Sequence, residues 1–161
     1  MKKLRLYVDT SVLGGVFDAE DTNRVNTAER LLRLIKNDVF EGFISLLTIE
    51  EILMAPKRIR VPLEKIISSS GFKSLEESEE SIELANAFLK DGDIPVKYRD
   101  DARHIAIAVC HEVDYLVSWN YKHMVNISVK RLINSTNIRM GYNPIEIISP
   151  EEVTGDGEME I

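Results

Sequence analysis

The sequence predicts a single α/β domain with a central parallel sheet of four or five strands flanked by helices. Short runs rich in β-branched and aromatic residues alternate with amphipathic helical segments along the 161 residues, the pattern of parallel strands joined by helical crossovers. No internal repeat, low-complexity tract or Pro/Gly linker divides the chain, and its length suits one domain. We therefore expect a domain over residues 1–149, followed by an acidic tail, 150–161, that frays.

The first half of the chain contains two predicted strands, each followed by a helix. Residues 3–8 form a short β-rich run. After the Gly14–Gly15 break, apolar residues recur at helical spacing at Ala28, Leu31, Leu32 and Ile35. Residues 42–47 form the second strand. Thr48 then begins a helix that stops before Pro56, because the residue before a proline disfavours helical geometry.

The second half repeats this alternation of helices and strands. The expected elements, in order, are a helix over 62–69, a short edge strand near 71–75, a helix that opens at Ser78 or Ser81, a helix over 98–112, a strand at 115–118, a helix over 124–137 and a strand at 145–148.

Composition excludes several classes of protein. Hydrophobic residues make up 44% of the chain and charged residues 29%, the balance of a soluble globular protein. No apolar run approaches the ~20 residues needed to cross a bilayer, and Asp9 interrupts the N-terminal apolar run before a signal-peptide core is complete. We therefore expect a cytoplasmic protein with no membrane association. Cys110 is the single cysteine, which excludes a disulfide framework and a Cys-rich zinc site.

Acidic and polar side chains follow the carboxyl ends of the predicted strands. In a parallel α/β sheet these ends share one edge with the N-termini of the connecting helices, and ligands bind there. The residues expected at this edge are Asp9 after the first strand, Glu50 and Glu51 after the second, Asp100 and Asp101 before the strand at 115–118, and Ser118 and Asn120 after it.

This acidic edge predicts a metal site, because gathered carboxylates repel each other and hold protons unless a cation compensates them. Oxygen ligands without cysteine favour a hard ion such as Mg²⁺ or Mn²⁺ over zinc. Such an ion activates water for attack on phosphorus, so the edge indicates phosphodiester hydrolysis. The net charge of −7 opposes binding to phosphates, but a bound divalent ion reverses the sign of the field at the site.

Each acid also has a purely structural explanation. The run Asp9–Ser11 can cap the next helical turn, and Thr48 with Glu51 fits a capping box. Asp100 and Asp101 can complement a helix dipole, an effect of about 0.3–1 kcal/mol. Capping accounts for each acid separately but not for their shared edge, which favours a functional role.

Four motifs resemble those of a known family, the PIN-domain nucleases, which include many toxin ribonucleases of prokaryotic toxin–antitoxin pairs. The motifs span residues 4–123 in the family's order and are YVDTSVL around Asp9, SLLTIEEIL around Glu51, DDARHIAIA around Asp101 and YLVSWNYKH around Asn120. The family's pattern selects Glu51 over Glu50 and Asp101 over Asp100.

The resemblance implies a PIN-like fold and a divalent-metal-dependent endoribonuclease that forms a homodimer and has an antitoxin protein as a partner. Asp9 and Asp101 would hold Mg²⁺ or Mn²⁺, and Glu51 would complete the coordination or bind through water. Asn120 stands where similar proteins often carry a fourth acid, so a second ion would be held less well. Asp9, Glu51, Asp101 and Asn120 are therefore the predicted catalytic residues.

Further residues flank the predicted edge. Supporting roles are assigned to Thr10, Ser11 and Ser118, and contacts to the RNA backbone to Arg99, Arg103 and Lys122. Surface or helix-packing roles are expected for His104, His111 and His123, which do not cluster at metal-ligand spacing. Trp119 either stacks on an exposed base or packs against a helix.

Two other functions remain open. A non-catalytic RNA-binding or assembly module that retains the PIN fold would account for Asn120 and for the acidic overall charge. A phosphatase-like or receiver-like domain also places acids at strand ends. It needs a lysine at the end of a late strand, and Lys122 is the only one nearby.

Overall fold

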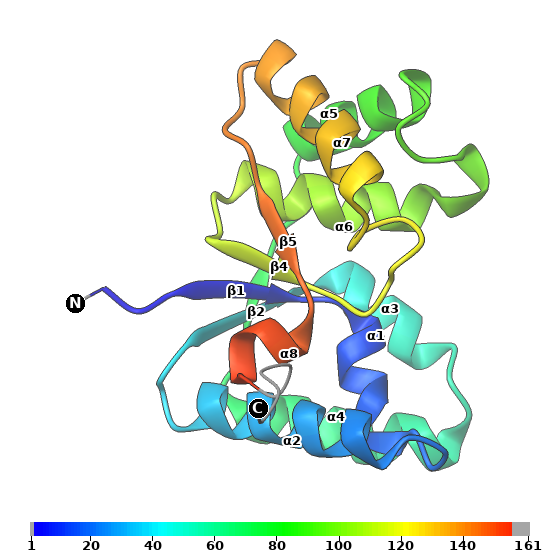
Figure 1. Ribbon diagram of the computed structural model, residues 1–161. Coiled ribbons are helices and arrows are strands. Elements are labelled where there is room, and N and C mark those ends of the chain that lie inside the picture. Colours follow the sequence, from blue (N-terminus) through cyan, green and yellow to red (C-terminus); the bar gives the residue numbers. More distant parts are fainter. Residues whose placement is uncertain (1, 156–161) are drawn as a thin grey trace.

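Parallel strands form the centre of the protein in the computed structural model, which describes residues 2–155 (Figure 1). The sheet has five strands in the order β3-β2-β1-β4-β5, so β1 lies in the middle. All four strand pairs are parallel. The strands are β1 (Arg5–Val8), β2 (Glu41–Ser45), β3 (Lys73–Leu75), β4 (Tyr115–Val117) and β5 (Glu146–Ile148). The predicted α/β class with a parallel sheet is confirmed.

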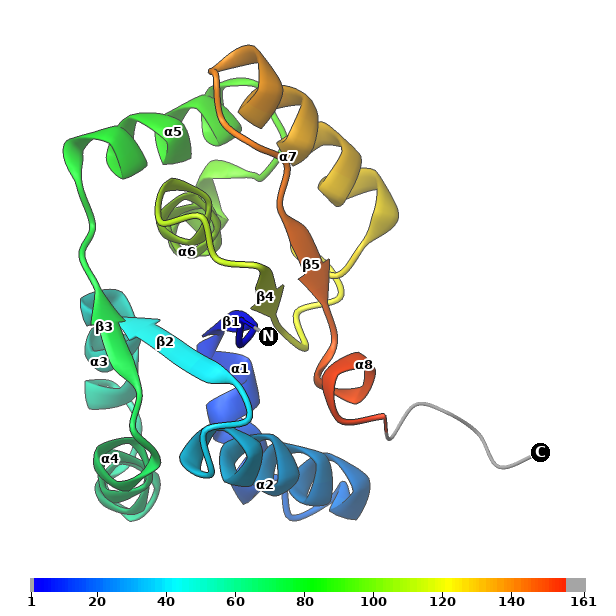
Figure 2. The same ribbon diagram turned by 90° about the vertical axis from the view of Figure 1, so that its left-hand side faces the viewer.

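Helices cover both faces of the sheet (Figure 2). One face carries α5 (Glu79–Lys90), α6 (Arg99–Cys110) and α7 (Ile127–Arg139). The other carries α1 (Thr10–Leu13), α2 (Thr22–Lys36), α3 (Leu46–Leu53), α4 (Lys57–Ser70) and α8 (Pro150–Thr154). Short 3₁₀ turns lie at Gly14–Phe17 and Val96–Tyr98. Within the described residues, no helix has the length and apolar character to cross a membrane.

The alternation of side chains along β1 divides the core into two layers. Leu6 and Val8 pack with α1, α2, α3 and α4, whereas Tyr7 packs with α5, α6 and α7. Successive residues of a strand point to opposite faces, and both faces of the central strand are therefore buried. A strand buried on both faces is fixed in position, and Asp9, the next residue, is fixed with it.

Two helix starts differ from the prediction because the capping residues differ. The second strand ends at Ser45 and α3 begins at Leu46, since Ser45 and Thr48 form a capping box across the first turn. Thr48 is therefore the third residue of the helix rather than its cap, and Glu51 lies in the second turn. In α7 the Asn126 side chain accepts hydrogen bonds from the backbone N–H groups of residues 128 and 129, so the helix begins at Ile127 rather than at 124.

The first part of the predicted frayed tail is a helix. Residues 150–154 form α8, which packs on α2. Pro150 occupies the first helical turn, where its missing N–H is not needed, and the Glu152 side chain accepts a hydrogen bond of 3.0 Å from the backbone N–H of Ser149. The expectation was wrong there because acidic composition outweighed this capping motif in the prediction. The rest of the predicted tail, residues 156–161, lies outside the described part of the chain.

Candidate active site

Asp9 leaves the end of β1 and is almost completely buried, with 5% of its surface exposed. Its Oδ2 accepts hydrogen bonds from Ser11 Oγ at 2.7 Å and from Ser118 Oγ at 2.9 Å. Although Asp9 occupies the N-cap position of α1, its side chain makes no capping hydrogen bond. The capping explanation therefore fails for Asp9, and the two predicted supporting serines hold its carboxylate.

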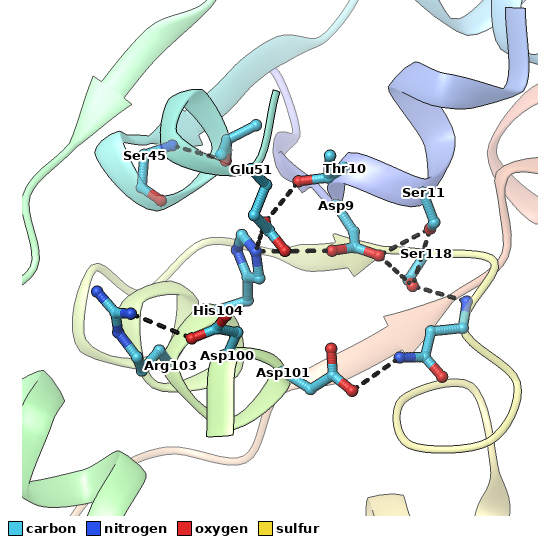
Figure 3. A network of polar contacts seen from close by, with 12 residues as sticks. Asp9, Thr10, Ser11, Ser45, Glu51, Asp100, Asp101, Arg103, His104 and Ser118 are labelled. Carbon is cyan, nitrogen blue, oxygen red and sulfur yellow. Dashed lines mark hydrogen bonds and ion pairs between the residues drawn. The ribbon is translucent and has the colours of Figure 1, made fainter. Parts of the chain in front are cut away.

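Glu51 points from α3 toward the same strand ends (Figure 3). Its Oε1 accepts a hydrogen bond from Thr10 Oγ1 at 2.8 Å and lies 2.5 Å from His104 Nε2. Burial raises the pKa of Glu51, but the hydrogen bond and charge of His104 and the hydrogen bond from Thr10 outweigh burial and hold the pKa below its ordinary value. The carboxylate is therefore ionised and strongly tethered.

Asp101 extends from the first turn of α6. Burial and the negative charge of Asp9 raise the pKa of Asp101, against the opposing hydrogen bond from Asn120 and the nearby His123. Asn120 Nδ2 donates to Asp101 Oδ2 at 3.1 Å, and His123 Nδ1 lies 3.3 Å from the same oxygen. Burial and the charge of Asp9 thus outweigh the effects of Asn120 and His123 on the pKa of Asp101.

Asn120 links the two halves of the site. Its backbone N–H donates to Ser118 Oγ at 2.9 Å, and Ser118 in turn donates to Asp9. The Asn120 side chain uses both of its ends, since Oδ1 accepts from the backbone N–H of His123 at 2.9 Å while Nδ2 donates to Asp101. Asn120 therefore positions Asp101 and the loop after β4.

The structure joins the predicted site residues into one polar network, formed by Asp9, Thr10, Ser11, Glu51, Asp101, Ser118 and Asn120 (Figure 3). His104 connects the Glu51 part to Asp9, because its Nε2 lies 3.9 Å from Asp9 Oδ1. Glu50 and Asp100, the neighbours that were not selected, are exposed. Asp100 instead pairs with Arg103 at 3.1 Å.

Sequence reasoning missed the two histidines of the site. His104 was expected in a surface or helix-packing role, but it is a fully buried member of the polar network, and Tyr7 Oη lies 2.7 Å from its Nδ1. Burial lowers the pKa of His104, but the hydrogen bond to Glu51 and the nearby carboxylates outweigh burial, so its pKa lies above its ordinary value. One indication was available: His104 follows Asp101 by three residues, which places both on one face of a helix.

The aromatic residue beside the site packs in the interior. Trp119 is 5% exposed, and its indole N–H lies 2.7 Å from Glu151 Oε1. A Cβ atom at Gly15 would come within 2.3 Å of the Trp119 ring, so this close approach requires glycine. Of the two roles considered for Trp119, packing is the one that the structure shows.

The predicted RNA contacts lie in three different surroundings. Arg103 is held by Glu77, with two contacts of 2.8 Å, and this partner raises the pKa of the guanidinium. Arg99 is exposed and lines a groove between α5 and α6. Lys122 is also exposed, and its ammonium group lies 5.5 Å from the centre of the Tyr98 ring, beside His123.

The described side chains do not form a closed metal cage. In the described part of the chain, no three His, Cys, Asp or Glu residues are grouped so that they could hold a metal ion. Mg²⁺ commonly uses only one or two carboxylates and keeps several waters. Asp9 and Asp101 are two carboxylates of this kind: the serines use only Oδ2 of Asp9, and Asp101 belongs to the same polar network through Asn120.

No protein-family model and no curated protein sequence matches the chain. Solved structures do match. A chain of the VapBC2 complex from Rickettsia felis, bound to a DNA fragment from its promoter, has a TM-score of 0.57 at 13% identity, covering 91% of this chain and 98% of that chain. VapC20 of Mycobacterium tuberculosis, a toxin that cleaves the sarcin–ricin loop, has a TM-score of 0.56 at 19% identity, with coverages of 73% and 91%.

A toxin–antitoxin complex from Klebsiella pneumoniae gives a similar result, with a TM-score of 0.54 at 21% identity over 73% of this chain and 88% of that chain. At such identities the likeness establishes the fold alone. The fold is that of PIN-domain toxins, in agreement with the resemblance seen in the four sequence motifs.

Proposed function

We propose that the protein is a divalent-metal-dependent endoribonuclease that hydrolyses RNA phosphodiester bonds and acts as the toxin of a toxin–antitoxin pair. The observation that carries the proposal is the polar network that joins Asp9, Glu51 and Asp101 at one edge of the sheet. The fold likeness to VapBC complexes and to a toxin that cleaves RNA supports it.

The chain's own residues have distinct tasks in this proposal. Asp9 and Asp101 would hold Mg²⁺ or Mn²⁺, and the ion would supply Lewis-acid and water-activating chemistry. Ser11 and Ser118 orient Asp9, and Asn120 orients Asp101. Because these contacts form before substrate arrives, the carboxylates need little rearrangement on binding.

A local cationic surface offsets the overall negative charge near Asp101. Lys97 and Lys122 are exposed, and their ammonium groups lie 5.7 Å and 5.5 Å from the centre of the Tyr98 ring. No ion pair with a described carboxylate involves either lysine. We propose that the RNA backbone passes over these lysines, together with Arg99. An antitoxin partner, a homodimer and a cytoplasmic location belong to the same proposal.

The test is cleavage of a structured RNA by the purified protein with and without Mg²⁺ or Mn²⁺. We expect metal-dependent cleavage that falls by at least about 100-fold in Asp9→Asn, since several kcal/mol of metal-derived stabilisation is lost. Asp100→Asn is the matched control, because Asp100 is exposed and outside the network. Cleavage that survives in an Asp9→Asn, Asp101→Asn double variant would overturn the proposal.

The second candidate function is a non-catalytic RNA-binding or assembly module. Asn120 favours this function, because it stands where similar proteins often carry a fourth acid. Its side-chain amide is hydrogen-bonded to Asp101 and to the backbone of His123. This function predicts RNA binding by the wild-type protein that is unchanged by chelation of divalent ions, with no cleavage of any RNA tested.

A further inference from the structure

The loop that follows β4 carries two hydrogen-bond donors of the site, one on each side of a buried tryptophan. Ser118 donates to Asp9, and Asn120 donates to Asp101. Trp119, between them, packs into the apolar core on the other side of the loop, and 5% of its surface is exposed. Because the three residues are consecutive, whatever holds the Trp119 side chain also limits the positions of Ser118 and Asn120.

Three elements contact the Trp119 side chain. Gly15, in the first 3₁₀ turn, approaches the ring so closely that an added Cβ would lie 2.3 Å from it. Arg24 of α2 has its guanidinium carbon 5.0 Å from the ring centre, within the range of a cation–π contact. Glu151 of α8 accepts the indole N–H, with its Oε1 at 2.7 Å and its Oε2 at 2.9 Å. Because this acceptor is charged, the hydrogen bond is stronger than one between neutral groups.

Glu151 is itself fixed by the C-terminal helix. α8 follows β5, has a capping box at its start, and packs on α2 (Figure 2). An acid in the first turn of a helix complements the helix dipole wherever its carboxylate points. The half-buried Glu151 carboxylate instead directs both oxygens to the indole of a residue 32 positions away. It therefore links α8 to the loop of the site.

We propose that Glu151 is a positioning residue, which holds Trp119 and through it the loop that carries Ser118 and Asn120. The C-terminal helix thereby stabilises the arrangement of the loop on which the orientation of Asp9 and Asp101 depends. The inference rests on the proposed function only in taking RNA cleavage as one of its readouts, because the contact itself belongs to the fold.

The first test measures the loop without any RNA. The backbone N–H groups of Trp119 and Asn120 donate to serine hydroxyls of the site at 3.1 Å and 2.9 Å. We expect both amides to exchange with deuterium at least about fivefold faster in Glu151→Ala than in wild type, read by NMR on the full-length protein. Glu29→Ala is the matched control, because it removes an exposed carboxylate from the same pocket between α2 and α8. Unchanged exchange in Glu151→Ala, or an equal rise in Glu29→Ala, would overturn the inference.

Further variants separate the hydrogen bond from the charge on the helix. Glu151→Gln removes the charge but keeps a side-chain oxygen that can accept the indole N–H, so we expect it to recover most of the protection lost in Glu151→Ala. In a Trp119→Phe background, which has no indole donor, Glu151→Ala should change the exchange little. Equal losses in the two Glu151 variants, or the same effect of Glu151→Ala in both backgrounds, would contradict the link.

The rate of RNA cleavage connects the loop to the reaction. We expect kcat to fall roughly 3- to 30-fold in Glu151→Ala with little change in KM, the range for substitutions that act through a packed network. Glu151→Gln should keep most of the wild-type kcat. Faster exchange of the loop with unchanged kcat would overturn the positioning role. Should Glu151→Ala fail to fold, Trp119→Phe removes the same hydrogen bond while keeping a ring in the core, and it decides the inference by the same readouts.

These readouts also separate the inference from the proposed function. Faster exchange of the loop in Glu151→Ala, in a protein that cleaves no RNA, would support the link between α8 and the loop and contradict the nuclease. Metal-dependent cleavage by wild type, with exchange and kcat both unchanged in Glu151→Ala, would do the reverse.

Discussion

Two acidic clusters in this protein differ in the cation that pairs with them. Between α5 and α7, Asp91 and Asp93 lie around the Thr136 hydroxyl, and Arg139 pairs with Asp91. The Thr136 hydrogen bond and the Arg139 partner hold the pKa of Asp91 below its ordinary value. At the strand ends, burial and the charge of Asp9 raise the pKa of Asp101 instead.

The difference lies in the cation. The α5–α7 cluster contains its own arginine, which pairs with Asp91, while burial and the charge of Asp91 raise the pKa of Asp93. The cluster joins the end of α5 to α7 through Thr136 and Arg139. Among the described residues, no lysine or arginine forms an ion pair with Asp9, Glu51 or Asp101. Their partners are hydroxyls, an amide and two imidazoles. Negative charge that the fold leaves uncompensated marks a place for an external cation.

The largest expected effect is on the rate of RNA cleavage, which a substitution in the strand-end cluster should reduce and one in the α5–α7 cluster should not. Asp101→Asn should reduce RNA cleavage by at least about 100-fold, because it removes one of the two proposed metal ligands. Asp93→Asn in the α5–α7 cluster should leave cleavage within about twofold, since the Asp93 carboxyl accepts from Thr136 and lies outside the strand-end network. Initial rates of cleavage under saturating Mg²⁺ measure both. Similar losses in the two variants would show that the clusters do not differ in function.

The next effect is on stability, which a substitution in the α5–α7 cluster should reduce. Thr136 is buried, and its Oγ1 lies 2.6 Å from Asp93 Oδ2 and 3.0 Å from Asp91 Oδ2. Thr136→Val leaves the buried Asp93 carboxyl without this donor, which should lower the free energy of unfolding by about 1–3 kcal/mol. Urea denaturation measures the change. Ser118→Ala is the companion variant at the strand ends, and it should reduce cleavage more than Thr136→Val does. A Thr136→Val protein that lost cleavage but kept full stability would contradict the contrast between the clusters.

A smaller effect should appear in the pH dependence of stability. Because the pKa of Asp101 is raised in the folded protein, the folded state holds this proton more tightly than the unfolded state. The stabilisation is complete below the ordinary range of an aspartate and is lost as the pH rises through the raised pKa. Asp101→Asn has no such loss, so its Tm relative to wild type should increase from acidic to neutral pH in the absence of divalent ions.

Thermal melts of both proteins between about pH 4 and pH 8 test this expectation. Addition of Mg²⁺ should narrow the difference at neutral pH, because ion binding stabilises the wild-type folded state selectively. A Tm difference that is constant with pH would show that the pKa of Asp101 is not raised in the folded protein. The contrast between the pKa values of Asp91 and Asp101 would then not hold.

The acids of the site could be predicted from sequence because their positions follow from general geometry. Asp9 comes directly after a strand, and Asp101 opens the helix before another, so the parallel sheet places both at one edge. The choice of Glu51 over Glu50 came from the family resemblance, and the structure places Glu51 in the network. These predictions needed only the order of elements and not their exact boundaries.

The place of His104 in the polar network could not be predicted in the same way. His104 meets Glu51 across 53 residues and Tyr7 across 97 residues, and no local pattern reports such contacts. The helix boundaries were wrong for a different reason, since Ser45 and Thr48 are both capping residue types and the structure uses the earlier one as the cap. Long-range pairing and competing caps are where sequence reasoning fell short.

The smallest expected effect tests the arginine that distinguishes the two clusters. Since the pKa of Asp91 is lowered in the folded protein, its contribution to stability is present above the ordinary pKa of an aspartate and is lost as the pH falls through the lowered value. Arg139→Ala removes the cation, so the variant should lose less stability on acidification than wild type does. Both residues are exposed to solvent, and salt should weaken the effect.

The measurement is the Tm of Arg139→Ala and wild type at low and high salt from about pH 3 to pH 7. Arg131→Ala, an exposed arginine of the same helix, is the matched control. If the acid-induced loss of stability were the same in wild type and Arg139→Ala, the arginine would not be what balances Asp91. The contrast between a cluster that contains an arginine and one that does not would then rest on the strand-end site alone.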